Sequence, residues 1–346
     1  MKLLNTIKGS VCREEIKKIC PHEHLFLDMT HEAVTPKTRA ERERFYGKIT
    51  METLGVLRRN PYVVRTNLIL DSVQDSINEL KYLKREECNL LVEVTSVGLG
   101  RDLKKLKQVS EETDLHIAVG CGFFVQETIP EDVARLSADA MAEIILGEIE
   151  DGIGETGIKP GVIGEIGTSE VIYESEHKSL LAAAKASIRT GLPIYLHTYP
   201  WSRAGLDAVD LLMNAGVAPR QICLCHLDVS FDREYLRQSL NMGVYVEFDN
   251  FGKEFYFQSQ CGAFSGGPFE TDVARVRMVK ELIAEGKVKQ ILAANDLCLK
   301  ASLHKYGGWG YDHVFHNVSE MMEQEGIDRA DIDTILVDNP KDFLFQ

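Results

Sequence analysis

One pattern recurs eight times along the chain: a short apolar run rich in β-forming residues, a polar turn, and a longer segment of helical periodicity. The apolar runs span residues 19–28, 89–97, 115–124, 161–169, 192–199, 221–228, 243–250 and 290–297. Helical segments between them include residues 71–86, 130–150, 176–190 and 271–285. Alternation on this scale predicts parallel strands joined by crossover helices, and eight such units close a (β/α)₈ TIM barrel.

An open, doubly wound α/β sheet is the alternative architecture. It is less favoured because no Gly-x-Gly-x-x-Gly motif follows the first apolar run. The chain shows no linker, internal duplication or low-complexity tract, so we expect a single domain over residues 1–346. Two long segments, 29–68 and 298–315, follow strand ends, and in a barrel the loops at that face build the active site.

Charge and hydropathy narrow the classes of partner. A net charge of −14 argues against nucleic acid or an anionic membrane surface as the partner, because both would repel the protein. The first residues lack the apolar run of a secretory signal, and no uncharged apolar stretch is long enough to span a bilayer. We therefore expect a cytoplasmic protein that acts on a small molecule.

His22 and His24 lie two residues apart in the first apolar run, in Cys20-Pro-His-Glu-His-Leu-Phe-Leu-Asp28. Alternate residues of a strand face the same side, so both imidazoles can reach one metal ion. A His-x-His pair by itself is common, and the prediction depends on ligands from other runs. Four more ligand-type residues lie near the ends of other apolar runs, namely Glu165, His197, His226 and Asp296.

Imidazole nitrogens and carboxylate oxygens suit Zn²⁺, and also Mn²⁺, Co²⁺ or Fe²⁺. Six ligands are too many for one tetrahedral catalytic zinc, so the set predicts two divalent ions. If Glu165 bridges them, His22, His24 and Asp296 bind one ion. His197 and His226 then bind the other.

An ordered set of motifs runs along the chain, and it resembles the phosphotriesterase family of the amidohydrolase superfamily. The motifs are Pro21-His-Glu-His24, Thr95-Ser-Val-Gly-Leu-Gly-Arg-Asp102, Glu165, His197-Thr198, Cys225-His-Leu-Asp228, Asn295-Asp296 and Asp338-Asn-Pro340. The resemblance covers nearly the whole chain. It implies a distorted barrel, a binuclear zinc-type centre, a homodimer, and hydrolysis of esters or lactones by a metal-bridging hydroxide.

Glu165 departs from the pattern of the best-known members, which place a carbamylated lysine at this position. In this respect the chain is similar to the phosphotriesterase homology proteins, whose bridging ligand is Glu. The exchange keeps a bridging carboxylate and removes the dependence on bicarbonate. It also makes organophosphate triesters a doubtful substrate.

Asp296 and Asp228 are the expected catalytic carboxylates. Asp296, close to the attacking water, would accept its proton and pass it on. Asp228 follows His226 by two residues, so it would share the lumen face and orient a ligand or relay the proton. A helix cap near Asp232 is an equally weighted interpretation of Asp228.

Substrate residues are less well marked by the sequence. The candidates are Lys253, which follows the seventh run, Arg275, which opens the next helix, and Tyr306, in the loop after the eighth run. His304, in the same loop as Tyr306, is a further candidate. Members of the family open phosphorylated sugar lactones, and these residues could hold such an anion. Each could equally be a solvated or packing residue.

The sequence therefore favours a binuclear metal-dependent hydrolase of an ester or lactone, with a phosphorylated sugar lactone as the expected substrate. Two alternatives stay open. The same centre could hydrolyse N-acyl, amide or phosphate-ester bonds. The barrel could also bind metal and a ligand without catalysis, although binding alone needs no proton acceptor such as Asp296.

Overall fold

The structure is a computed structural model that describes residues 2–256 and 267–346. Eight parallel strands form one sheet whose order follows the chain. They are β3 (Lys18–Glu23), β6 (Cys88–Glu93), β7 (His116–Cys121), β8 (Val162–Gly167), β9 (Ile194–His197), β10 (Ile222–Leu224), β11 (Tyr245–Phe248) and β12 (Ile291–Ala293). Each lies within a predicted run or overlaps it, so the predicted barrel is confirmed.

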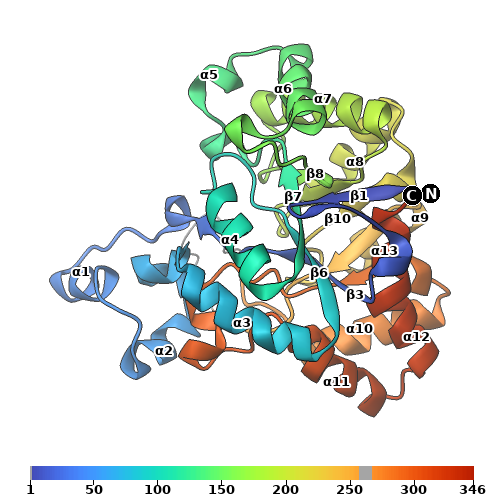
Figure 1. Ribbon diagram of the computed structural model, residues 1–346. Coiled ribbons are helices and arrows are strands. Elements are labelled where there is room, and N and C mark those ends of the chain that lie inside the picture. The colour runs from blue at the N-terminus through green and yellow to red at the C-terminus, as the bar shows by residue number, and fades with distance from the viewer. Residues whose placement is uncertain (1, 257–266) are drawn as a thin grey trace.

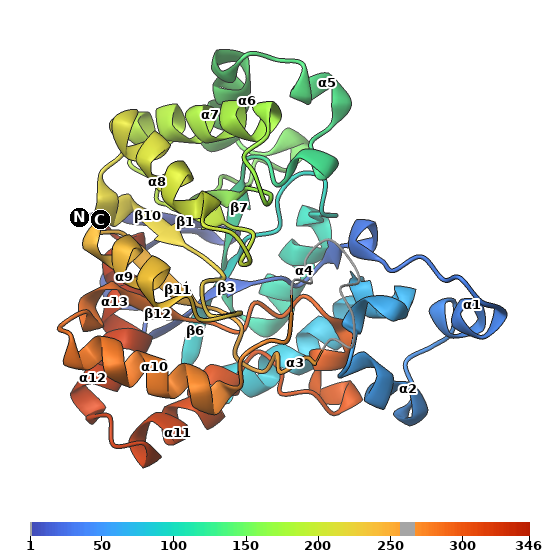
Figure 2. The ribbon, with the colours of Figure 1, turned by 180° about the vertical axis from the view of Figure 1, so that it is seen from behind.

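Helices pack around the outside of this sheet (Figures 1 and 2). They are α3 (Val73–Arg85), α4 (Leu103–Thr113), α6 (Ala138–Asp151), α7 (Glu174–Thr190), α8 (Ala204–Asn214), α9 (Arg233–Asn241), α10 (Asp272–Ala284), α11 (Ser319–Gln324) and α12 (Arg329–Asp333). The last helix, α13 (Asn339–Leu344), lies at one end of the barrel. The helix expected over 130–150 is broken into α5 (Glu131–Ala134) and α6. Ser137 causes the break, because its extended backbone and its hydroxyl, which accepts from the Ala140 N–H, start a new helix.

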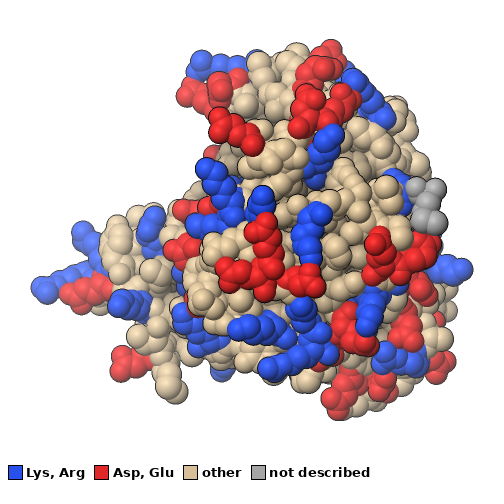
Figure 3. All heavy atoms as spheres, viewed as in Figure 1, with Lys and Arg blue, Asp and Glu red and all other residues tan. Residues whose placement is uncertain are grey.

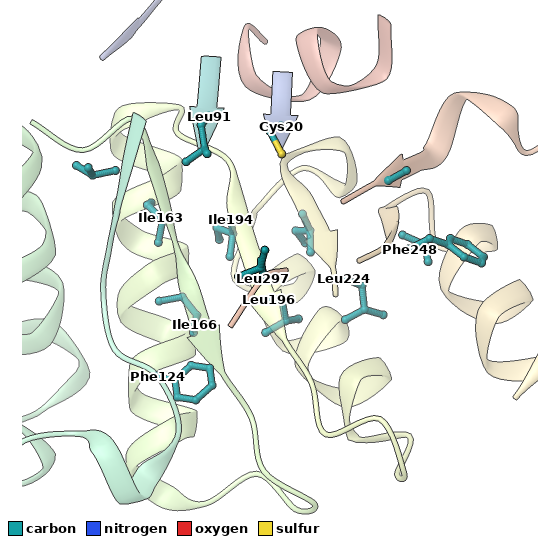
Figure 4. Close-up of a cluster of buried hydrophobic side chains, with 14 of the residues drawn as sticks. Cys20, Leu91, Phe124, Ile163, Ile166, Ile194, Leu196, Leu224, Phe248 and Leu297 are labelled. Atoms are coloured by element: carbon teal, nitrogen blue, oxygen red, sulfur yellow. The ribbon is translucent and has the colours of Figure 1, made fainter. Parts of the chain in front are cut away.

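Alternation along the strands gives the barrel an outer and an inner core cluster. The outer cluster lies between strands and helices and includes Ile163, Ile194 and Leu224 (Figure 4). The inner cluster holds the intervening residues, such as Tyr195 and Tyr245. Apolar side chains therefore fill the amino-terminal part of the barrel interior and leave its other end for polar groups.

Glu23 completes the barrel where its first and last strands meet. Among the described residues, no backbone ladder joins β12 to β3. The buried Glu23 carboxylate instead accepts hydrogen bonds from the Asn295 N–H at 3.1 Å, the Asn295 amide at 2.7 Å and the Leu297 N–H at 2.7 Å. The Glu23 side chain thus links the first strand to the end of the last one in place of backbone hydrogen bonds, and it fixes the loop that carries Asp296.

The amino-terminal end of the barrel is closed by elements that the sequence did not indicate. A hairpin of β1 (Leu3–Thr6) and β2 (Gly9–Cys12) contributes to the inner cluster, as does α13. From α13, Phe343 packs edge-on against Tyr195 and Tyr245, with ring centroids 5.2 and 5.1 Å apart. The barrel is therefore a packed core at this end.

Residues 29–68 form an arm between β4 (Leu27–Asp28) and β5 (Ile69–Leu70), which pair antiparallel. It contains α1 (Arg39–Phe45) and α2 (Met51–Leu57) and projects from one side of the barrel (Figures 1 and 2). The sequence indicated only a long polar segment here. No helix in the described part of the chain is long and apolar enough to cross a membrane.

Replacing Phe343 by alanine should destabilise the barrel, because it empties a fully buried aromatic site. We expect the free energy of unfolding in urea to fall by about 3–5 kcal/mol. Phe345→Ala is the matched control, since Phe345 is only partly buried beside the same cluster and should cost clearly less. Equal losses for the two variants would contradict the packed inner core.

Candidate metal centre

The structure brings all six predicted ligand residues together at the carboxyl-terminal end of the barrel. His22 and His24 lie at the end of β3, Glu165 on β8 and His197 at the end of β9. His226 and Asp296 lie just beyond β10 and β12, where both adopt left-handed backbone conformations, with φ of 67° and 43°. Such conformations are uncommon for residues other than glycine and are typical of functional sites.

The ligand atoms form two groups that share Glu165. In the first, His24 Nε2 lies 3.1 Å and His22 Nε2 lies 3.8 Å from Asp296 Oδ1. In the second, His226 Nε2 lies 2.8 Å from His197 Nδ1 and 3.0 Å from Glu165 Oε1. Glu165 reaches back to the first group, with Oε1 3.4 Å from His22 Nε2 and Oε2 3.6 Å from His24 Nε2.

The residues fit a metal centre by their donor chemistry. His22 is fully buried, and its Nε2 has no hydrogen-bond partner among the described residues. Its other ring nitrogen, Nδ1, donates to Glu247 Oε2 at 2.8 Å, which directs the Nε2 atom into the cluster. A buried, unpartnered nitrogen beside two carboxylates is a position for a cation.

Two buried carboxylates, Glu247 and Asp249, accept hydrogen bonds from the histidines on the side away from the cluster, and they were not predicted from the sequence. Asp249 Oδ1 accepts from His226 Nδ1 at 3.0 Å, and Glu247 holds His22 as described above. Glu247 lies on β11 and Asp249 directly follows it, in the stretch Tyr245-Val-Glu-Phe-Asp249, where acids alternate with apolar residues. Two acids at spacing two in an apolar run were the available signal. Thr95 Oγ1 supports His24 Nδ1 at 2.7 Å.

Asp228 and Arg275 form a buried pair away from the cavity. Arg275 Nε lies 3.0 Å from Asp228 Oδ2, and Arg275 Nη1 lies 2.9 Å from Asp272 Oδ1. Both members of the first pair are fully buried. The geometry therefore corrects the expected substrate contact of Arg275, because its guanidinium is enclosed by these carboxylates.

Asp228 is placed to position a ligand. Its carboxylate accepts from the Asn250 side chain at 2.8 Å, and the same amide donates to Asp249 at 2.7 Å. Asp249 in turn holds His226. The helix-cap interpretation is wrong, since α9 is capped by Asp232, which accepts from the Tyr235 N–H.

A cavity of about 360 Å³ lies over the cluster. Apolar and aromatic side chains line much of it, and Glu32, Glu127 and Glu170 lie on its wall. Lys253 is the one Lys or Arg among its described lining residues, and its ammonium group is paired with Asp296.

The two residues from the loop after β12 lie elsewhere. Tyr306 lines a separate depression that includes Arg58 and Trp309. It does not line the cavity over the metal cluster, so the expected substrate contact of Tyr306 is corrected. His304 stacks on Tyr82 and pairs with Glu79. Both belong to the packing of that loop.

Electrostatics in the metal-free cluster favour positive charge around Glu165. Burial would raise the pKa of Glu165, yet His22, His197 and His226 hold it well below its ordinary value. Burial likewise opposes the charged form of His226, but Asp249 and Glu165 raise its pKa to about 10. His197, for which burial dominates, has its pKa lowered to about 4. The carboxylates thus recruit protons where metal ions are absent.

Glu247→Gln should weaken metal binding by about 10-fold, because it removes the negative charge that orients His22. The measurement is metal content after dialysis against graded chelator. Glu143→Gln, an exposed carboxamide exchange on α6, is the matched control. Identical retention of metal in both variants would show that Glu247 does not support the centre.

Metal loading should release protons at pH 7. His226, whose pKa Asp249 and Glu165 raise to about 10 against the effect of burial, is protonated at pH 7 in the metal-free protein and must lose a proton to bind an ion. Glu165 and Glu247 also raise the pKa of His22 in spite of its burial. Calorimetric titration in two buffers of different ionisation enthalpy measures the release, and at least about one proton per chain is expected from His226. Heats independent of the buffer would contradict this assignment.

Comparisons with known proteins agree with this geometry. The model of the phosphotriesterase family matches residues 2–344. N-acetyltaurine hydrolases of Danio rerio and Homo sapiens are 34% and 35% identical to the chain over 344 residues, which is 99% of this chain and 97% of each relative.

Two solved structures share the fold. A resiniferatoxin-binding protein from Rhodobacter sphaeroides has a TM-score of 0.94 at 32% identity, covering 99% of this chain and 94% of that one. A phosphotriesterase homology protein from Escherichia coli, with phosphate in its active site, has a TM-score of 0.78 at 26% identity, covering 94% and 98%. Since the family match extends over every strand that supplies a ligand-type residue, the chain belongs to the phosphotriesterase family of hydrolases.

Proposed function

We propose that the protein is a binuclear metal-dependent hydrolase that cleaves the amide bond of a small N-acyl compound. The observation that carries the proposal is the position of Asp296. Its carboxylate lies 3.1 Å from His24, pairs with Lys253 and lines the cavity. A buried carboxylate beside both a metal position and the substrate space is placed for proton transfer.

Two ions, with Zn²⁺ as the first choice, would be held by the two groups of ligands that share Glu165. When bound, divalent ions supply Lewis acidity that lowers the pKa of a water molecule and polarises the scissile carbonyl. His22, His24 and Asp296 would hold the first, and His197 and His226 the second. The fixed negative charge of Glu165 lies between them.

Asp296 performs the proton transfers in this proposal. Lys253 and the neighbouring histidines hold its pKa below the ordinary value in spite of burial, so the carboxylate is ionised and able to accept a proton from the attacking water. It then delivers that proton to the leaving amine. Asp228 contributes by fixing His226 through Asn250 and Asp249.

The choice of an amide rests on the relatives. Proteins named N-acetyltaurine hydrolase share about a third of their residues with this chain over almost all of its length. An acyl group fits the apolar part of the cavity, which includes Leu27, Phe124 and Leu299. Lys253 is the one lysine or arginine of the described lining, and its charge would attract a leaving amine that carries an anionic group, as taurine does.

A phosphorylated sugar lactone, or another phosphate ester, is the second candidate. It is favoured by the phosphate in the active site of the Escherichia coli neighbour and by Lys253. The three glutamates on the cavity wall and the distant position of Arg275 serve a phosphate dianion poorly. A protein that only binds a ligand would have no use for the proton-accepting position of Asp296.

The test is a substrate panel with zinc-loaded protein. It contains N-acetyltaurine, N-acylated amino acids of increasing acyl length, lactones with and without a phosphate, and carboxylic esters. We expect the highest kcat/KM among the N-acyl amides. Turnover of phosphorylated lactones in preference to every amide would contradict the proposal and promote the second candidate.

Asp296→Asn should lower kcat on the best substrate by at least about 100-fold, because general acid and base catalysis by a positioned side chain contributes 10²–10⁴. Metal content should fall by less than the rate, since five ligands remain. Asp132→Asn, exposed on α5, is the matched control. A variant with full metal and near-native kcat would exclude Asp296 as the proton carrier.

A further inference from the structure

The arm contains a second cavity of about 350 Å³, comparable in volume to the one over the metal cluster. Phe45 on α1, Val56 on α2 and Val63 form apolar parts of its wall. Phe45 is buried and the two valines are partly buried. The wall can therefore contact an apolar group without being rebuilt.

Three cations line the same cavity: Lys37, Arg44 and Arg59. In the described part of the chain, none of them has a carboxylate within ion-pair distance, whereas their neighbour Arg39 pairs with Glu43 at 2.9 Å. Glu41 is the one carboxylate of this lining, and it accepts backbone N–H groups of Lys37 and Thr38 at 2.7 and 2.8 Å. The lining therefore carries three positive charges against one negative charge.

This charge stands against the rest of the protein. The arm carries eight Lys or Arg residues and four Glu, whereas the whole chain has a net charge of −14. Lys and Arg side chains are prominent on the projecting part of the molecule in Figure 3, where α1 and α2 lie. The arm therefore provides a local attraction for an anion that the surrounding surface repels.

The arm cavity is distinct from the catalytic one, although one wall separates them. Tyr62 lines the catalytic cavity, while its neighbours Asn60 and Val63 line the arm cavity. The Val34 N–H donates to the Tyr62 carbonyl oxygen at 3.0 Å and ties the two sides of this wall together.

We propose that the arm cavity binds an organic anion, a carboxylate that carries an apolar chain. The carboxylate is held by Lys37, Arg44 and Arg59 through charge-assisted hydrogen bonds, and the chain lies against Phe45, Val56 and Val63. This site is independent of the proposed amide hydrolysis, because none of its six residues lines the catalytic cavity.

Calorimetric titration of the zinc-loaded protein with octanoate tests the proposal. We expect saturable binding that weakens at least 10-fold in the double variant Arg44→Gln/Arg59→Gln. The matched control is Arg42→Gln/Arg58→Gln, which removes two charges from the same helix and loop at positions that do not line the cavity. Its affinity for octanoate should stay within 2-fold of the native value.

Acetate separates the two parts of the site. Because it lacks the apolar chain, it should bind at least 10-fold more weakly than octanoate. Octanoate affinity that is equal in both double variants would place the ligand elsewhere and overturn the proposal, as would acetate binding as tight as octanoate. If the first double variant does not fold, Lys37→Gln provides the same comparison.

Discussion

An ionised carboxylate buried at the centre of a barrel is the constraint on which the site depends. Glu165 is 2% exposed, and burial of its charge is tolerated only because opposite charge surrounds it. Three imidazoles lie within 3.5 Å of its Oε1 atom. In the metal-free protein protons supply the compensating charge, and in the family to which the chain belongs this position serves divalent metal ions.

The barrel interior meets this constraint because it is apolar at one end of the axis and polar at the other. Apolar residues of the inner cluster and Phe343 fill the amino-terminal half, so water is excluded from beneath the cluster. The strand ends then carry the histidines and acids, with Glu247 and Asp249 behind them. The low-dielectric surroundings strengthen each of these contacts and make each ligand position costly to lose. Glu23, another buried carboxylate, fixes the loop of Asp296 where the first and last strands of the barrel meet.

Much of this arrangement could be predicted from the sequence, because it rests on periodicity. The eight strands and the six ligand-type residues follow from alternation and from the rule that strand ends carry function. The roles of Arg275 and Tyr306 could not be read in that way, since whether a loop cation reaches a cavity or a buried aspartate depends on tertiary packing. The β1/β2 hairpin and the helices of the arm were missed because short elements leave weak periodic signals.

The most direct test of this account is a crystal structure of the protein as purified, with anomalous diffraction recorded on either side of the zinc absorption edge. The account predicts two anomalous peaks, one beside His22, His24 and Asp296 and the other beside His197 and His226, with Glu165 between them. A single peak, or peaks away from Glu165, would contradict the assignment of this cluster as a binuclear centre.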